Sequence, residues 1–358
     1  MKVALVSKSF KPNVGGIEIV VEQLQNALIE KNIDAFVLTQ TKQNNKNEKI
    51  ISMNFLNCFS KLKKLSPDII HIHGFRSISI PVAAAAKILK IPVIITPHFD
   101  YDSNFKNKLN IFVHKKSSFK KIIALTEFEK NKLIELGFHN IEVIPNFFDY
   151  ALLDVSAREF RKTFQIPQDS FLFLFAGRLA SNKGIPYLIE AFSKLEFEKK
   201  FLAVIGKQDK RFKDTTFDYY NSLAEKFGVK NKVVFTGRIN EFLLAQGFHE
   251  CNAVVFPSIA SEAFGLVLLQ AMYCEKPVIA SSLEPIKEII KHKETGLLVE
   301  PRNADALAEA MQSLALNLEL CQKLGVNGKK RAIEYYSKQQ IVQKHIELYS
   351  SILEKKQI

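Results

Sequence analysis

The segment SEAFGLVLLQAM, residues 261–272, places an acid in front of a Phe-Gly step and a long apolar run. The acid is Glu262, and the amide of Gln270 interrupts the apolar run eight positions later. If a helix spans 264–274, the two side chains lie about 12 Å apart along it, because each helical residue rises roughly 1.5 Å. Backbone amides at its start, at Phe264 and Gly265, would face a phosphate. The spacing fits a nucleotide diphosphate-sugar stretched from its sugar to its ribose.

Two cations follow an earlier apolar run in the segment FAGRLASNKG, residues 175–184. Arg178 comes directly after the strand pattern, and Lys183 directly before a helix that starts near Gly184. Arg offers a planar fork of donors and Lys a point charge, and each charge-assisted hydrogen bond contributes about 1.5–3 kcal/mol. The pair predicts a cradle for a diphosphate. The alternative is two solvated surface cations, but their place at a strand end favours the cradle.

Paired glycines, Gly15 and Gly16, stand between the apolar run 3–7 and a helix that starts near Ile17. Glycines at a helix N-terminus let the backbone approach an anion closely, although most loop glycines only make turns. No Gly-x-Gly occurs anywhere in the chain. Since nicotinamide and flavin enzymes of the Rossmann type normally carry Gly-x-Gly-x-x-Gly after a strand, a dehydrogenase is disfavoured.

Histidines provide a second kind of polar group. His71 and His73 share one face of a strand in HIHGF, residues 71–75, and His98 follows the next strand. The three could bind a metal, but no carboxylate of suitable spacing accompanies them. The Asp-x-Asp formed by Asp100 and Asp102 is a pattern that is frequent by chance. We therefore expect no metal and interpret His98 as a contact to a substrate hydroxyl.

The elements that must position these residues form two series of short apolar runs separated by helical patterns. The first series is 3–7, 34–38, 68–72, 92–96, 121–125 and 141–144, and the second is 171–177, 201–206, 232–237, 253–257, 277–281 and 296–299. Such runs are typical of parallel strands buried on both faces. They predict an α/β fold with two doubly wound, Rossmann-like domains, 1–149 and 150–337. Ligands bind outside the carboxyl ends of such strands, so the site is expected in the cleft between the domains.

Composition narrows the class of protein. The 358 residues, 47% of them hydrophobic, are enough for two globular domains. Four scattered cysteines without a CxxC pair, no apolar run as long as a membrane span and no signal-peptide core predict a cytoplasmic protein. The formal net charge is +13, and residues 1–150 contribute +8 of it, from 21 Lys and Arg against 13 Asp and Glu.

Basic residues are frequent in the segment 101–121, where Leu109, Phe112 and Val113 form an apolar stripe at helical spacing. The simplest interpretation is a helix that packs its stripe on the domain and exposes its lysines. The alternative is peripheral contact with the anionic inner face of the cytoplasmic membrane, where each lysine would contribute about 1 kcal/mol. A nucleic acid partner is disfavoured because aromatic side chains do not alternate with the basic ones.

Taken in order, several segments resemble the retaining glycosyltransferases of family 4 (glycosyl transferases group 1), which have the GT-B fold. They are PNVGGIE, TPHFD, VIPNFFD, FAGRLASNKG, VVFTGRI, FPSIASEAFGLVLLQAM, KPVIAS, PIKEII and TGLLVEP. The resemblance covers nearly the whole chain. It implies that a sugar is transferred from a nucleotide-sugar co-substrate with retention of anomeric configuration, without a metal or other cofactor. It also implies that the last helix, in 338–358, crosses back to the first domain.

The resemblance assigns each candidate residue a role by position. Arg178 and Lys183 would bind the donor diphosphate and neutralise the leaving group. Glu262 would hold hydroxyls of the donor sugar, and His98 would contact its far hydroxyl; these four are the expected catalytic residues. The other expected donor contacts are Gly15, Gly16, Phe264, Gly265 and Gln270, and the expected acceptor or interdomain residues are Asn146, Asp149 and Glu288.

Gln270 departs from the family pattern, in which a second Glu binds the ribose hydroxyls. A neutral amide still binds a diol, but without charge assistance we expect a loss of about 1 kcal/mol in donor binding. Ala263 and Glu275 stand where the family usually has glycine. These departures bear on the choice of donor more than on the fold, and we expect a UDP-sugar first and GDP-mannose second.

Three functions are compatible with these residues. The first is a retaining transferase that extends a saccharide or lipid-linked saccharide in a bacterial surface glycan, namely lipopolysaccharide, capsule or a glycoprotein glycan. It needs no second carboxylate across the sugar from Glu262, because front-face attack requires only positioning and charge stabilisation. The second is a nucleotide-sugar epimerase or a soluble glucan synthase on the same fold. The third, suggested by Gln270, is a protein that binds a nucleotide-sugar without catalysis.

Overall fold

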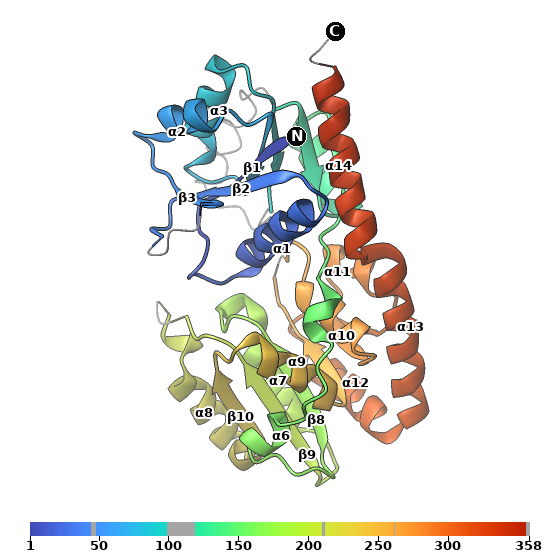
Figure 1. Cartoon of the computed structure of the whole chain (residues 1–358). Helices are drawn as coiled ribbons and strands as arrows, with labels where there is room; N and C mark the ends of the chain where they lie inside the picture. The colour runs from blue at the N-terminus through green and yellow to red at the C-terminus, as the bar shows by residue number, and fades with distance from the viewer. Residues whose placement is uncertain (44–47, 99–118, 210–211, 261, 356–358) are drawn as a thin grey trace. The chain divides into compact units, whose positions relative to one another are not determined.

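The computed structural model describes residues 1–43, 48–98, 119–209, 212–260 and 262–355 (Figure 1). The chain divides into two compact units. Unit 1 comprises Met1–Phe148 and Lys338–Ile358, and unit 2 comprises Asp149–Ser337. Within the described ranges, no helix has both the length and the apolar character that crossing a lipid bilayer requires.

Unit 1 is built on a seven-stranded parallel sheet with the order β3-β2-β1-β4-β5-β6-β7. Its strands are β1 (Lys2–Ser7), β2 (Asp34–Thr39), β3 (Ile50–Ser52), β4 (Ile69–His73), β5 (Val93–Thr96), β6 (Lys121–Ala124) and β7 (Ile141–Val143). The strand order reverses at β1, which pairs with both β2 and β4. In doubly wound sheets, ligands bind at the carboxyl ends of the strands beside such a reversal.

Helices cover both faces of this sheet. On one face lie α2 (Cys58–Leu65), α3 (Ser79–Ile88) and α5 (Glu127–Glu135), and on the other lie α1 (Gly16–Glu30) and α14 (Lys338–Glu354). Alternate residues of β1 supply the two cores, because successive side chains of a strand point to opposite faces. The last helix, α14, lies beside α1 (Figure 1). Residues near the two ends of the chain therefore share one hydrophobic core.

Unit 2 is built on a six-stranded parallel sheet with the order β10-β9-β8-β11-β12-β13. Its strands are β8 (Phe171–Ala176), β9 (Lys200–Ile205), β10 (Val233–Gly237), β11 (Ala253–Phe256), β12 (Val278–Ser281) and β13 (Leu297–Val299). Here the order reverses at β8, which pairs with β9 and β11. The segments that follow β8 and β11 are the ones that carry Lys183 and Glu262.

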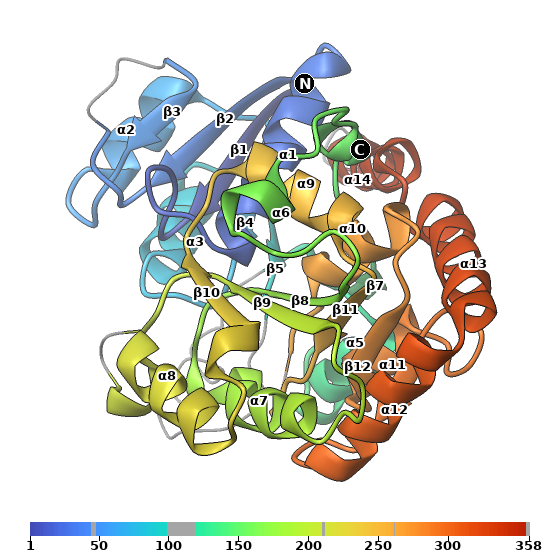
Figure 2. The same cartoon turned by 90° about the horizontal axis from the view of Figure 1, so that it is seen from below.

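The larger helices of unit 2 are α7 (Ile185–Ser193), α8 (Phe217–Lys226), α9 (Glu241–Glu250), α10 (Leu266–Tyr273), α12 (Ala304–Leu316) and α13 (Leu318–Tyr336), and the shorter ones are α6 (Phe160–Thr163) and α11 (Glu284–Ile289). Helices α7 and α12 pack side by side (Figure 2). Helix α13 packs on α10, and Gly325 permits the contact because a Cβ there would lie 2.1 Å from Glu275 O.

The prediction of two doubly wound, parallel α/β sheets is confirmed. The sequence missed β3, a three-residue strand at the edge of the sheet of unit 1, because its apolar run is too short to stand out. The helix expected from Phe264 begins at Leu266, since Gly265 takes φ +96° at its N-cap. The basic segment 101–121 falls almost wholly outside the described residues, as do Asp100 and Asp102.

Candidate active site

In unit 2, a lysine, a glutamate and a serine meet beside the carboxyl ends of β8 and β11. Lys183 Nζ forms an ion pair with Glu262 Oε1, and Ser258 Oγ donates a hydrogen bond to the same oxygen at 2.6 Å. The side chains of Lys183 and Glu262 are only 15% and 11% exposed, so water screens the pair weakly. Glu262 Oε2 has no hydrogen-bond partner among the described residues and is available to a ligand hydroxyl.

The loop that carries Lys183 is fixed against the loop that carries Glu262. Ile259 N donates a hydrogen bond to Asn182 O at 2.9 Å. Gly184 has φ +67°, and a Cβ at this position would lie 1.9 Å from Pro257 O. Only glycine permits this approach of the two backbones. The glycine next to Lys183 therefore places its ammonium beside a carboxylate that is 79 residues further along the chain.

Arg178 lies two residues after the end of β8, and its side chain is exposed. No described side chain forms an ion pair with its guanidinium. The strand ends of β8 and β9 approach closely here, since a Cβ on Gly206 would lie 1.7 Å from Gly177 O. An exposed guanidinium at a strand end, on the same loop as Lys183, is suited to bind a diphosphate.

Helix α10 follows Glu262 and begins after Gly265. The Phe264 side chain is 3% exposed and meets the Tyr336 ring edge-on, with ring centroids 5.8 Å apart, so only its backbone can face a ligand. Gln270 is buried on α10, with 8% of its surface exposed. The first backbone N–H groups of a helix lack partners within the helix and carry partial positive charge, which suits α10 to face a phosphate.

In unit 1, Gly15 is the N-cap of α1 and Gly16 its first residue. A Cβ on Gly16 would meet no atom within 4 Å, so the backbone is open to a ligand on that side. A Cβ on Gly15 would lie 2.6 Å from Glu18 Oε2, because the Glu18 side chain turns back over the start of the helix. This carboxylate would have to move before an anion could reach the first amides of α1, since like charges repel.

His98 follows β5 and has the left-handed backbone angle φ +49°. Its Nε2 is hydrogen-bonded to Nδ1 of His73, the last residue of β4, at 3.1 Å. Burial, and then the nearby charge of Arg76, lower the pKa of His98 to about 3. The imidazole is therefore neutral near pH 7. It is suited to form a hydrogen bond with a hydroxyl and not to act as a cation.

Beneath His98 lies a buried network that links β4, β5 and α14. His71 is hydrogen-bonded to Tyr349 Oη and to Thr96 Oγ1, both at 2.8 Å. Because both ring nitrogens of His71 are used, the interpretation of His71 as a metal ligand is disfavoured. Burial and the neighbouring histidines lower the pKa values of His71 and His73 well below the usual range.

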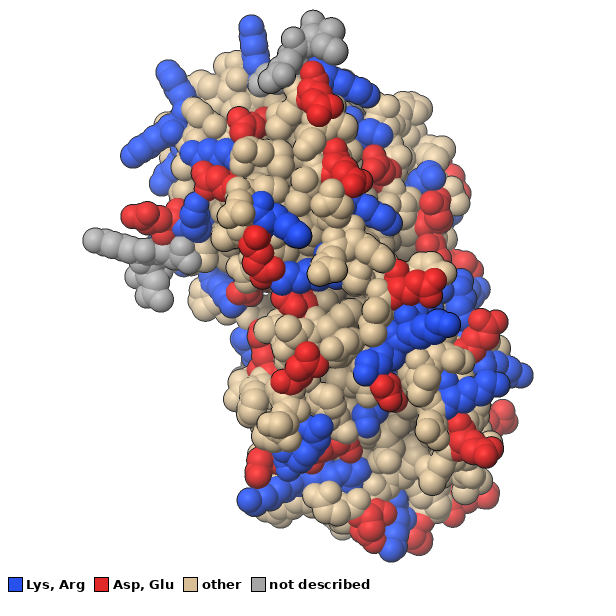
Figure 3. Space-filling view, turned by 45° about the vertical axis from the view of Figure 1, so that its right-hand side comes forward, with Lys and Arg blue, Asp and Glu red and all other residues tan. Residues whose placement is uncertain are grey.

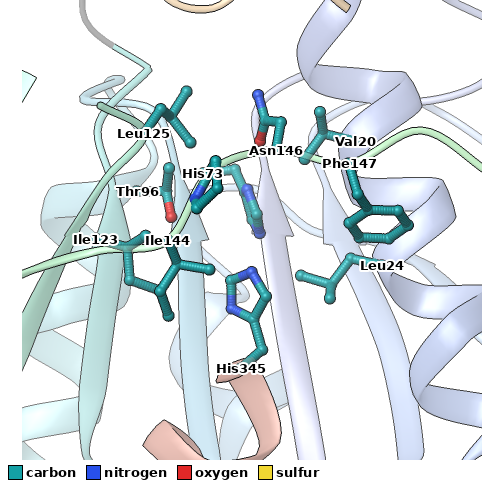
Figure 4. Close-up of a pocket in the computed structure, with 11 residues that line it drawn as sticks. Val20, Leu24, His73, Thr96, Ile123, Leu125, Ile144, Asn146, Phe147 and His345 are labelled. Atoms are coloured by element: carbon teal, nitrogen blue, oxygen red, sulfur yellow. The ribbon is translucent and has the colours of Figure 1, made fainter. Parts of the chain in front are cut away.

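A small cavity of about 10 Å³, roughly the space that one water needs, opens beside this network. The His73 and Thr96 side chains line it from the sheet, and His345 lines it from α14 (Figure 4). His73 Nε2 and His345 Nδ1 are buried and have no hydrogen-bond partner among the described residues. Burial lowers the pKa of His345 to about 4. His345 and Tyr349 were not predicted from the sequence, although their i, i+4 spacing on one helix face would have been a signal.

The three residues expected at an acceptor or interdomain position lie in different settings. Asn146 is 8% exposed and lines the cavity of unit 1. Asp149 is the first residue of unit 2. Glu288 lies on α11, and its carbonyl oxygen accepts a hydrogen bond from Arg331 at 2.7 Å. In the ranges that the structure describes, no three His, Cys, Asp or Glu side chains are arranged to hold a metal.

The structure thus brings together Lys183 with Glu262 in unit 2, and His98 with His73 in unit 1. It adds Ser258, which was not predicted, to the first pair. The signal available for Ser258 was its place two residues after a strand and four residues before Glu262. Both clusters lie at carboxyl ends of strands, where ligands of such sheets bind.

Comparison with known proteins identifies two family models that match in succession. The model for Glycosyltransferase Family 4 matches residues 14–152, and the model for Glycosyl transferases group 1 matches residues 156–331. The solved structure of Anabaena HepE (Alr3699) in complex with UDP and glucose is similar, with a TM-score of 0.86 and 21% identity, over 98% of this chain and 100% of that chain. At this identity the likeness shows the fold alone.

Three curated relatives illustrate the range of similarity. The glycosyltransferase MJ1607 of Methanocaldococcus jannaschii is 34% identical over 227 residues, which are 63% of this chain and 55% of that protein. The glycosyltransferase MJ1178 of the same organism is 29% identical over 92% of this chain and 93% of its own length. O-antigen chain mannosyltransferase C of Escherichia coli is 30% identical over 52% of this chain and 48% of its own length. Since the two family models together cover all but a few short segments, the chain belongs to the family 4 glycosyltransferases and has the GT-B fold.

Proposed function

We propose that the protein is a metal-independent, retaining glycosyltransferase that moves a hexosyl group from a nucleotide-sugar to a saccharide or lipid-linked saccharide. The observation that carries the proposal is the Lys183–Glu262–Ser258 cluster of unit 2, with the exposed Arg178 on the same loop as the lysine. It combines cations for a leaving diphosphate with a carboxylate oxygen that is open to sugar hydroxyls.

The donor diphosphate would lie between the loop after β8 and the start of α10. Lys183 has three N–H donors and uses one for Glu262, so others remain for phosphate oxygens. Arg178 would add a bidentate contact, and the N-terminal amides of α10 would add partial positive charge. Glu262 Oε2 would accept hydrogen bonds from sugar hydroxyls, while Ser258 and Lys183 hold Oε1 in place.

In the proposed reaction, the bond between the anomeric carbon and the diphosphate oxygen breaks as the acceptor oxygen bonds to the same face of that carbon. The acceptor hydroxyl proton passes to an oxygen of the leaving phosphate, so atoms and charge balance. Charge builds up on the diphosphate during this step, and Arg178 and Lys183 would stabilise it. Preorganised cations of this kind contribute roughly 3–4 kcal/mol to a transition state.

His98 would contact a hydroxyl of the donor sugar as a neutral imidazole. Its low pKa supports this role, because a neutral ring can donate from one nitrogen and accept at the other. With Nε2 engaged by His73, the atom available to the sugar is Nδ1. His98 therefore fits a hydrogen-bonding residue and not a general acid.

A UDP-sugar is the donor that we favour, and GDP-mannose is the second candidate. The UDP complex of HepE, which shares the fold, supports the first, and the name of the E. coli mannosyltransferase supports the second. That name also supports synthesis of a bacterial surface polysaccharide as the setting. We place the reaction in the cytoplasm or at the inner face of the cytoplasmic membrane, where nucleotide-sugars are available.

Two other functions from the sequence remain as alternatives, a nucleotide-sugar epimerase or glucan synthase and a binder without catalysis. The buried amide of Gln270 is the observation that bears on the binder. An epimerase would release free products from the donor without an acceptor, whereas a binder would leave the donor intact with every acceptor.

The test is thermal unfolding of the purified protein with UDP-, GDP- and ADP-sugars, in EDTA throughout. A donor at a hundred times its dissociation constant adds about 2.7 kcal/mol to stability. We expect stabilisation by one nucleotide family and its loss in Arg178→Ala. The control is Arg158→Ala, which removes an equal, exposed charge from the loop before α6. The donor so found is then incubated with saccharide acceptors, and NMR of the product reports its anomeric configuration.

Each result bears on a separate part of the proposal. Stabilisation that Arg178→Ala leaves unchanged would contradict the assignment of the donor site. Binding without turnover, for any acceptor in the screen, would favour the non-catalytic alternative. An inverted product would contradict retention, and stabilisation only after a divalent metal is added would contradict metal independence.

A further inference from the structure

Unit 1 exposes a small group of large apolar side chains at the beginning of α2. Leu56 is 96% exposed, Phe55 is 52% exposed and Phe59 is 39% exposed. Isolated exposed apolar residues are common on protein surfaces, but three within five positions are not scattered singly. We name Phe55, Leu56 and Phe59 the apolar tip.

The apolar tip is held in a braced turn. Asn54 Oδ1 accepts hydrogen bonds from Leu56 N and Asn57 N, both at 3.0 Å, and Asn57 Oδ1 accepts one from Asn54 N at 2.8 Å. These reciprocal bonds fix the backbone between β3 and α2. On the inner side, Cys58 and Leu62 are buried in the core of unit 1. The turn therefore presents Phe55 and Leu56 outward from a fixed base.

The surroundings of the apolar tip are basic. Residues 50–98 contain six cations, Lys61, Lys63, Lys64, Arg76, Lys87 and Lys90, and one carboxylate, Asp68. Asp68 lies just before β4, at the amino ends of the strands, where it accepts a hydrogen bond from Lys2 N at 2.7 Å. Lys87 and Lys90, at the end of α3 and before β5, lie at this same end of the sheet, so the basic groups nearest the apolar tip are those of α2. The carboxylates Glu18 and Glu22 lie on α1, which covers the other face of the sheet. By contrast, acidic and basic side chains are interspersed on the face that Figure 3 shows.

The apolar and basic groups share helix faces. Phe59 and Lys63 are spaced i and i+4, which places them along one side of α2, and Leu56 lies in the turn directly before the helix. Lysines beside exposed apolar residues can extend their stems along a membrane surface while their ammonium groups contact headgroups.

We propose that the apolar tip and the lysines of α2 form a docking surface for an anionic lipid bilayer. The charge complementarity favours lipid over an apolar protein partner, because interface cores are depleted in lysine. The turn follows β3 and therefore lies at the carboxyl ends of the strands, where His73 and His98 also lie. Docking through the apolar tip would bring the carboxyl ends of the strands of unit 1, where ligands bind, close to the membrane surface.

The test is flotation of the whole protein with vesicles, without donor or acceptor, so its result does not depend on the proposed sugar transfer. Vesicles of phosphatidylcholine alone are compared with vesicles containing one-third phosphatidylglycerol, at low and high salt. We expect binding to the anionic vesicles at low salt. The variant Phe55→Ser with Leu56→Ser should lower the binding constant at least about tenfold, since two apolar side chains no longer insert. Lys63→Gln with Lys64→Gln should lower it by about fivefold for each lysine removed.

Matched controls come from unit 2. Leu316 and Leu318 are 71% and 70% exposed, and changing both to Ser removes a similar apolar area. Lys291→Gln with Lys293→Gln removes two exposed lysines. Both controls should float as the unchanged protein does. All variants replace exposed residues, and far-ultraviolet circular dichroism confirms that each is folded.

Three outcomes would overturn the proposal. One is no flotation of the unchanged protein with anionic vesicles at low salt. Another is flotation that both apolar-tip and lysine variants retain, which would assign membrane contact to another part of the chain. The third is a concentration-dependent dimer that Leu56→Ser abolishes while vesicles are not bound, which would assign the apolar tip to self-association.

Discussion

Unit 2 places charged side chains beside the carboxyl ends of its strands, whereas unit 1 places neutral imidazoles there. Lys183 and Glu262 form a largely shielded ion pair, and Arg178 is exposed on the same loop as Lys183. In unit 1, His98 and His73 share a hydrogen bond above two further buried histidines, and burial keeps all four uncharged. Two parallel sheets of the same kind therefore carry different side chains at the carboxyl ends of their strands: charged groups in unit 2 and neutral imidazoles in unit 1.

The difference follows from what surrounds each cluster. In unit 2, the Glu262 carboxylate pairs with the Lys183 ammonium and accepts a hydrogen bond from Ser258, so one carboxylate balances one ammonium. In unit 1, Tyr349 and His345 of α14 lie against His71, and no carboxylate among the described residues is hydrogen-bonded to the four histidines. A histidine buried without a counter-charge stays neutral, because the desolvation cost of its cation is not offset. Unit 2 is thus suited to stabilise charge, and unit 1 to bind hydroxyl groups.

The largest expected effect is a loss of stability of unit 1 in acid. Histidines that are neutral when folded take up protons when unfolded, so stability falls as the pH drops below about 6.5. The pKa values of about 4 for His345 and about 3 for His98 extend this loss to at least pH 4. Each histidine contributes a loss of about 2 kcal/mol between pH 7 and pH 5, so two of the four already give about 4 kcal/mol.

Hydrogen exchange at pH 7, 6 and 5, corrected for intrinsic rates, measures this effect for each unit. Peptides from β1 and β4 should lose protection more steeply than peptides from β8 and β9, because unit 2 has no buried histidine among its described residues. The variant His345→Phe should reduce the pH dependence of the opening free energy of unit 1 by the equivalent of about one proton. Equal slopes in the two units would show that the histidines are not neutral as described.

The second prediction tests the role of the Lys183–Glu262 ion pair of unit 2. Lys183→Ala should lower kcat/KM for transfer by roughly 10²–10³, because a preorganised cation beside the leaving group is lost. The control Lys287→Ala removes an ammonium that pairs with the exposed Glu284 on α11 and should leave kcat/KM unchanged. A loss of less than tenfold in Lys183→Ala would mean that the shielded pair holds the loops together without taking part in transfer.

A smaller effect is expected for the neutral histidines of unit 1. His73→Phe keeps the shape of the ring but removes the hydrogen bond to His98 Nε2, so we expect about a tenfold loss in kcat/KM. The loss should be the same at pH 6 and pH 8, since His98 does not titrate in this range. His139→Phe, at an exposed position of unit 1, is the control. A loss that varies with pH would show that His98 acts through its charged form.

The smallest effect concerns Gln270. Gln270→Glu should strengthen donor binding about fivefold, because charge-assisted hydrogen bonds to a ribose diol are stronger than neutral ones by about 1 kcal/mol. Calorimetry with the donor measures it. Gln312→Glu on α12 is the control, since its side-chain oxygen can still accept from Glu196 N. Weaker binding in Gln270→Glu would indicate that the buried amide has a structural role in α10.

Most of the architecture could be predicted from sequence, because parallel strands buried on both faces leave continuous apolar runs. Every predicted run became a strand, and no strand end differs from its prediction by more than one residue. The edge strand β3 escaped prediction since its three residues are only partly buried and leave no such run. The positions of Arg178, Lys183 and Glu262 at strand ends also follow from local pattern, as the motif of each adjoins its strand.

The partners of those residues could not be predicted in the same way. Ser258 and Lys183 share one oxygen of Glu262, and the contact depends on the approach of Gly184 to Pro257. Nothing in the local spacing around Lys183 specifies a carboxylate 79 residues away. The same holds for His71 and Tyr349, which are 278 residues apart and hydrogen-bonded.

By itself, the sequence determined the two doubly wound sheets, their strand positions and the placement of the chemical groups after strands, because periodicity and residue type are local properties. Only the tertiary structure decided the state and partners of those groups. It packed α14, with His345 and Tyr349, against His71 of the sheet so that the histidine cluster stays neutral, and it closed the β8 loop on the β11 loop so that Lys183 pairs with Glu262. Burial and proximity depend on how distant segments pack, and it is these two quantities that set charge and reactivity.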